Sequence, residues 1–155
     1  MRKLIAASAA VVALAACSSG GQSVRLPKPE IQLIQTSSIP TAAKDIEGTI
    51  GVHYGVRVTN KANEAITLKR VSVQSLGEGA YIVGPTSAPF DVAIAPGSTE
   101  DVQFWTSAQT GRSVVGANGP VTLRITCEFK SASAGTFQSI ATQVVNSRTS
   151  ITGEQ

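Results

Sequence analysis

Few side chains in this sequence have the types and spacing that catalysis needs. The single histidine, His53, takes a polar position in an alternating apolar–polar segment, which is typical of an exposed strand residue. Two carboxylates close to it in sequence, Asp45 and Glu47, would be its partners in general acid–base chemistry. Glu100 and Asp101 are adjacent, so a strand would direct them to opposite faces. We therefore expect no enzyme active site, no metal and no cofactor.

The two cysteines have different surroundings in the sequence. Cys17 ends an apolar N-terminal run, whereas Cys127 takes an apolar position in the alternating segment 121–129. A cysteine at such a position behaves as a small hydrophobic residue. We expect Cys127 to be buried and inert, and a reactive or intermolecularly paired thiol is the alternative.

The first sixteen residues have the composition of a secretory signal. Arg2 and Lys3 form a positively charged start, and an unbroken apolar run covers residues 4–16. A transmembrane helix needs about 17–25 apolar residues, so this run is too short to span a bilayer. We expect a signal helix over residues 1–16 that is removed, followed by a flexible tether rich in Ser, Gly and Pro up to residue 30.

The sequence Leu14-Ala15-Ala16-Cys17 closely resembles the lipobox of bacterial lipoproteins. The resemblance implies cleavage before Cys17, a diacylglyceryl group on its thiol and acylation of its new amino group, for instance with palmitate. In Gram-negative lipoproteins Asp after the cysteine favours the inner membrane, and here Ser18 takes that place, which favours the outer membrane, facing the periplasm. In a Gram-positive host the same signal would leave the protein on the outer face of the single membrane. An ordinary secretory signal with a chance cysteine is the alternative.

Length and charge limit the choice of partners. Without residues 1–16 the 155-residue chain keeps 139 residues, enough for one domain. It then has 11 of the 13 Lys and Arg residues against 10 Asp and Glu, a net charge of +1. This balance gives no electrostatic reason to expect nucleic acid as a partner.

Alternating segments predict an all-β domain over residues 31–146, with a disordered tail over 147–155. The two clearest strands are residues 48–60 and 121–129, and we expect 48–60 to form an antiparallel hairpin with 65–76. Within 65–76 the apolar residues change from even to odd positions at Lys69-Arg70, which predicts a β-bulge there. A Pro96-Gly97 turn follows another alternating stretch, as in a type II turn.

The region after that turn holds the candidates for recognition. Trp105 should point away from a core that includes its neighbours, and we expect it to cover the open end of the fold, with an exposed anchor as the alternative. Residues 107–120 are rich in Gly and predict a long surface loop, in which Arg112, Val114 and Val115 are the candidate binding residues.

The order of elements predicts a single antiparallel β-sandwich of seven to eight strands. The strand end Val56-Arg57-Val58-Thr59-Asn60, the bulged strand 66–73 and the turn at Ile94-Ala95-Pro96-Gly97 resemble immunoglobulin-like or fibronectin-type-III-like domains. A Cys…Trp…Cys signature is missing, and a transthyretin-like sandwich is the alternative.

We expect a non-enzymatic, lipid-anchored envelope protein that acts as a structural or adaptor module and has a protein partner. Recognition would use an exposed sheet edge or the loop 107–120. The alternative is a small-ligand binder or an inhibitor of a secreted enzyme. A hydrolase of cell-wall material, with His53 as its base, is the third hypothesis.

Overall fold

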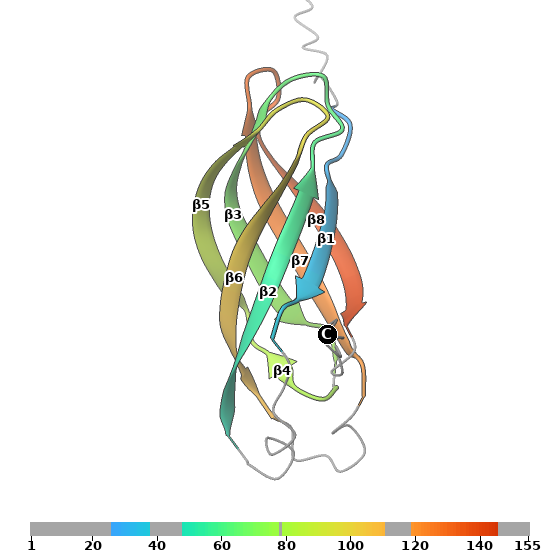
Figure 1. Ribbon diagram of the computed structural model, residues 1–155, viewed down its shortest axis with the longest axis vertical. Helices are drawn as coiled ribbons and strands as arrows, with labels where there is room; N and C mark the ends of the chain where they lie inside the picture. Colours follow the sequence, from blue (N-terminus) through green and yellow to red (C-terminus); the bar gives the residue numbers. More distant parts are fainter. Residues whose placement is uncertain (1–25, 38–47, 78, 111–118, 146–155) are drawn as a thin grey trace, which may run out of the picture.

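The computed structural model describes residues 26–37, 48–77, 79–110 and 119–145. These residues form eight strands in two antiparallel sheets, which face each other along the long axis of the molecule (Figure 1). The strands are β1 (Glu30–Gln35), β2 (Thr49–Thr59), β3 (Ile66–Ser75), β4 (Ile82–Val83), β5 (Thr86–Ile94), β6 (Thr99–Gln109), β7 (Val121–Ser131) and β8 (Gly135–Val145). The predicted all-β sandwich is confirmed. The expected signal helix, most of the tether and the tail lie outside the described residues.

One sheet has the order β1-β2-β6-β4 and the other has the order β5-β3-β7-β8. In the part of the chain that is described there is no helix, and so none long and apolar enough to cross a membrane.

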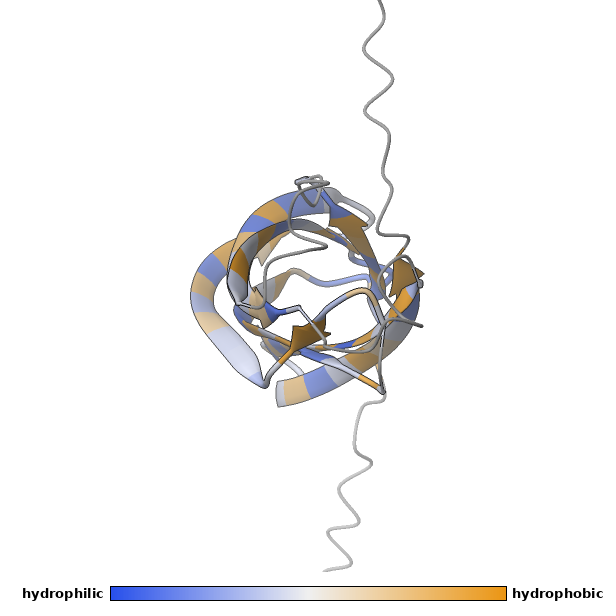
Figure 2. Cartoon of the chain, turned by 90° about the horizontal axis from the view of Figure 1, so that it is seen from below, coloured by the Kyte–Doolittle hydropathy of each residue, from blue (hydrophilic) through white to orange (hydrophobic). Residues whose placement is uncertain are grey.

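The space between the sheets holds a continuous hydrophobic core. Hydropathy alternates along the strands around this interior (Figure 2), as expected when every second side chain points inward. Residues of 1% exposure or less include Leu33, Tyr54, Leu68, Ile125 and Phe129. The predicted burial of Cys127 is confirmed, at 0% exposure.

The predicted hairpin of residues 48–60 with 65–76 is wrong, because β2 and β3 belong to different sheets. The loop after β2 carries the chain from one sheet to the other, and the strands pair instead with β6 and β7. Alternation specifies which face of a strand is buried, but it does not specify the neighbouring strand.

The predicted bulge is confirmed. The register of β3 shifts between Leu68 and Arg70 against both β5 and β7. The turn after Ala95 is also as predicted: Gly97 has a φ of 71°, and the Ser98 N–H donates to the carbonyl oxygen of Ala95 at 3.1 Å. β5 runs through Pro89 without a break, because β5 is an edge strand and a proline is tolerated there.

The last strand follows a regular alternation that its sequence conceals. Ser139 and Val145 point inward, whereas the outer residues Ile140 and Val144 are 53% and 57% exposed. Phe137, Ala141 and Val145 share the inward face with Ser139, so only Ile140 and Val144 depart from the core side. These two residues lie on the outer face of the sheet, which is open to solvent.

Candidate functional site

The residues predicted for binding and lipidation lie outside the described residues. They are Cys17, Arg112, Val114 and Val115. The carboxylates proposed as partners of His53, Asp45 and Glu47, also lie outside them. The predicted loop over 107–120 begins later than expected, because β6 continues as far as Gln109.

Trp105 is an exposed residue in the middle of a sheet face and does not cover an end of the fold. Its neighbours Phe104 and Thr106 are buried, and Trp105 itself is 64% exposed. The expectation of a covering role fails because β6 extends four residues past Trp105, so the indole lies far from the strand end. His53 of β2 is directly opposite in the register, and the two rings stack with centroids 6.5 Å apart.

Within the described residues, the protein surface around this ring pair has small side chains and no carboxylate, lysine or arginine. Gly51 and Gly55 precede and follow His53 by two residues on the same strand, and a Cβ at Gly51 would meet nothing within 4 Å. On β1, Ile34 lies opposite Gly55 and is 39% exposed. We call the outer surface formed by Ile34, His53, Gln103, Trp105 and Ser107 the Trp105 face.

One ion pair borders the Trp105 face. Both oxygens of Asp101 accept hydrogen bonds from the Arg57 guanidinium, at 2.9 and 2.8 Å. The hydrogen bond from Arg57 holds the pKa of Asp101 below its usual value. The two charges satisfy each other, and the Trp105 face itself has no carboxylate, lysine or arginine.

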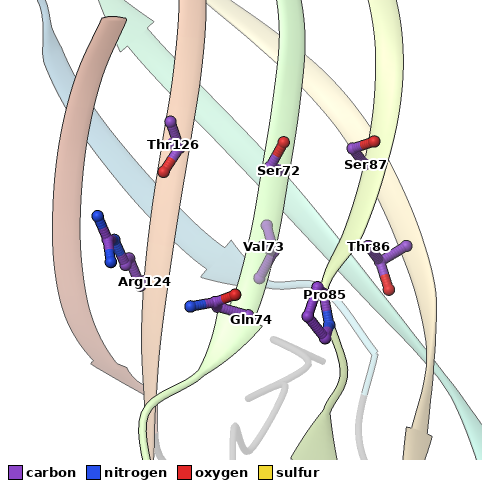
Figure 3. A pocket seen from close by; sticks show the side chains of 8 residues that line it. All are labelled: Ser72, Val73, Gln74, Pro85, Thr86, Ser87, Arg124 and Thr126. Carbon is purple, nitrogen blue, oxygen red and sulfur yellow. The ribbon is translucent and has the colours of Figure 1, made fainter.

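The outer face of the opposite sheet has a hollow of about 320 Å³. Its lining comes from β3, β5 and β7 and from the residue before β5 (Figure 3). The lining residues are Ser72, Val73, Gln74, Pro85, Thr86, Ser87, Arg124 and Thr126. We call this site the β3–β7 hollow. The set contains hydroxyls, one amide and one guanidinium, and no carboxylate.

Sequence reasoning did not find this hollow. Ser72, Arg124 and Thr126 occupy polar positions of their strands, but their meeting depends on the pairing of β3 with both β5 and β7. No local motif encodes that pairing.

The described part of the chain offers few side chains for nucleophilic catalysis or metal binding. No group of three His, Cys, Asp or Glu side chains that could hold a metal ion lies together there. Burial raises the pKa of the Cys127 thiol from 9.0 to about 12, so the thiol stays protonated at neutral pH.

Comparisons with known proteins give a fold likeness only. No protein-family model matches the chain. No curated protein matches it either. Among solved structures, the structural-genomics target SoR45 has a TM-score of 0.52 at 11% identity, over 77% of this chain and 84% of that one. A Bordetella pertussis protein described as ApaA has a TM-score of 0.48 at 16% identity, over 77% of this chain and 91% of its own. The likeness to SoR45 supports the fold and carries no function.

Proposed function

We propose that this chain is a lipid-anchored bacterial envelope protein whose sandwich domain binds a partner protein. The anchor is Cys17, proposed on its lipobox-like sequence, and the proposed location is the outer membrane, facing the periplasm. In a Gram-positive host the location is the outer face of the single membrane. The role is that of a structural or adaptor module.

The observation that carries this proposal is the exposure of Trp105. Tryptophan is the residue type most enriched among interface hot spots, and truncating one costs at least about 2 kcal/mol of binding. Trp105 stands on a paired strand and stacks on His53, so little conformational entropy opposes its binding. Because the Trp105 face has no carboxylate, lysine or arginine, the matching centre of the partner is an uncharged, apolar surface.

We propose further that the sandwich is immunoglobulin-like. In constant-type immunoglobulin domains the sheets have the orders A-B-E-D and C-F-G. Here β1-β2-β6-β4 follows the first pattern, and β3-β7-β8 follows the second, with β5 added beside β3. β1 and β2 are consecutive in one sheet and β7 and β8 in the other, whereas every connection from β2 to β7 passes between the sheets.

The partner proposal is tested by placing a photo-crosslinking amino acid at Gln103, beside Trp105, in the tagged full chain in its host. A crosslinker at Gln138, on the opposite sheet, is the control. We expect one protein to crosslink from position 103 and not from 138. Direct binding of that protein should weaken about 30-fold in Trp105→Ala and remain unchanged in Ile140→Ala. Equal binding by the Trp105→Ala variant contradicts the proposal.

The lipid anchor has a separate test. Cys17→Ser should accumulate as the unprocessed precursor without incorporated fatty acid, whereas Cys127→Ala should mature normally. Normal maturation of the Cys17→Ser variant contradicts the anchoring proposal and leaves the Trp105 interaction to be decided by the crosslinking experiment.

The small-ligand alternative is favoured by a different observation, the β3–β7 hollow. Its volume of about 320 Å³ is at the lower end of the range for small-molecule sites. Which ligand chemistry the hollow fits follows from its polar groups.

A further inference from the structure

The floor of the β3–β7 hollow is a row of three hydroxyls on three neighbouring strands. Ser72 of β3 lies opposite Ser87 of β5 on one side and opposite Thr126 of β7 on the other. Figure 3 shows their side chains at one level. Neighbouring strands are about 4.8 Å apart, so the row is about 10 Å long. Small side chains in the row, with larger ones beside it, produce a depression on this face.

Cationic and amide groups border this row. The next pair along β3 and β7 is Gln74 and Arg124, which are cross-strand neighbours and line the hollow. On the other side, Arg70 donates from Nη1 to the Ser87 hydroxyl at 3.4 Å, so its guanidinium turns toward the row. Two guanidiniums therefore border the three hydroxyls.

The charge balance favours an anion. In the same sheet, Glu128 lies opposite Arg70 in the register and Asp91 lies on β5. Asp91 is engaged by the Lys69 ammonium at 2.6 Å, and neither carboxylate lines the hollow. Arg124 has no carboxylate partner within the ranges that the structure covers.

The donors of the hollow are also unused. Within the described residues, the side chains of Ser72, Gln74, Arg124 and Thr126 make no hydrogen bond to another protein group. A guanidinium offers a planar pair of N–H donors that matches two oxygens of a carboxylate or phosphate. Hydroxyl and amide groups supply further donors at fixed spacing on the rigid sheet.

We propose that the β3–β7 hollow binds the oxyanion group of a small molecule, with Arg124 as the charged partner and the hydroxyl row as additional donors. Phosphate and carboxylate share this chemistry. The proposal does not depend on the Trp105 interaction, because the two sites lie on the outer faces of different sheets.

The test is a nitrogen-15 NMR titration of the purified full chain in detergent micelles, with phosphate and with acetate, at constant ionic strength. We expect saturable shifts at the Ser72, Gln74 and Thr126 amides and at the Arg124 Nε–H with at least one of the two anions. A response to phosphate alone assigns a phosphate ligand, and a response to acetate alone assigns a carboxylate.

Arg124→Gln should weaken the responding anion about tenfold or more. Lys130→Gln is the matched control, because it removes the same charge from the same face of β7, six residues away. It should leave the titration unchanged, and both variants should keep the native spectrum because both positions are exposed. Unsaturable shifts with both anions, or equal binding by Arg124→Gln, would overturn the proposal.

Discussion

The side-chain amide of Gln143 forms both hydrogen bonds that a neighbouring strand would make with the backbone of Leu33. The Leu33 N–H donates to Gln143 Oε1 at 2.8 Å, and Gln143 Nε2 donates to the Leu33 carbonyl oxygen at 2.6 Å. Leu33 is in β1 and Gln143 is in β8, the edge strands of opposite sheets. One side chain thus joins the sheets and satisfies the edge of β1, which limits pairing with another chain at that point.

We expect Gln143→Leu to destabilise the fold by about 1–3 kcal/mol, because it leaves a partly buried N–H and C=O without partners. Urea unfolding followed by circular dichroism measures the loss, and amide exchange at Leu33 should accelerate. Gln138→Leu, on the outer face of the same strand, is the control and should change stability by less than about 0.5 kcal/mol. Equal stability of both variants would refute a structural role for this bond.

A second polar contact is fully enclosed by the core. The Tyr81 hydroxyl donates to Gln35 Oε1 at 2.9 Å, and the Tyr54 and Tyr81 hydroxyls are also 2.9 Å apart. Because Tyr81 gives its only proton to Gln35, Tyr54 must be the donor of the second bond. The order of donors is therefore fixed as Tyr54, Tyr81, Gln35.

This order predicts unequal effects of two otherwise identical deletions. Tyr81→Phe removes the shared oxygen and leaves both the Tyr54 donor and the Gln35 acceptor unpaired, so we expect a loss of about 2–4 kcal/mol. Tyr54→Phe removes only the terminal donor, and its expected loss is about 1 kcal/mol. Chemical unfolding of the two variants side by side decides the matter, and an equal loss would contradict the assigned direction.

The sequence predicted those parts of the fold that depend on local alternation. The bulge at Leu68–Arg70 and the burial of Cys127 followed from the phase of apolar residues along one strand. The partner of β2 did not follow, because pairing is decided by contacts between distant segments. The β3–β7 hollow depends on the pairing of three strands at once, so the sequence did not reveal it. Trp105 was correctly placed outside the core, but its distance from the strand end required the true length of β6.

Asn60 has a structural role that its place in the sequence does not reveal. Asn60 begins the loop after β2 without a positive φ, which among the described residues only glycines have. Its buried side chain instead connects two loops. Nδ2 lies 2.8 Å from the Glu64 carbonyl oxygen and 3.1 Å from that of Ile94, and Oδ1 accepts from the Ala62 N–H at 2.9 Å.

We expect Asn60→Ala to destabilise the fold by about 2–4 kcal/mol, because several buried backbone groups lose their partner at once. Asn63→Ala, in the same loop but exposed, is the control and should be close to neutral. Thermal unfolding of the two variants measures the difference. A melting temperature for Asn60→Ala equal to that of Asn63→Ala would show that water replaces the amide without cost.

Alkaline pH should unfold the protein through its buried acids. Burial is the main cause that raises the pKa of both Tyr54 and Tyr81 above the usual 10.0, and it raises that of Cys127 from 9.0 to about 12. Below pH 9 these groups hold their protons in both folded and unfolded chains, so their contribution to stability is fully present. As pH rises past 9 for the thiol and 10 for the tyrosines, the unfolded chain loses protons that the folded chain keeps. Stability then falls by up to about 1.4 kcal/mol per pH unit for each group.

Absorbance at the tyrosinate band provides a direct measurement, since the chain has two tyrosines and both are buried. We expect no ionisation near pH 10, followed by a steep rise that coincides with the loss of the β-sheet circular dichroism signal. Cys127→Ala should move the start of the stability decrease from about pH 9 to about pH 10, because it removes the most acidic of the three groups while leaving both tyrosines in place. A gradual titration centred at pH 10 with an intact circular dichroism signal would mean that the hydroxyls exchange protons with water in the folded state, and the enclosed order of donors would then be wrong.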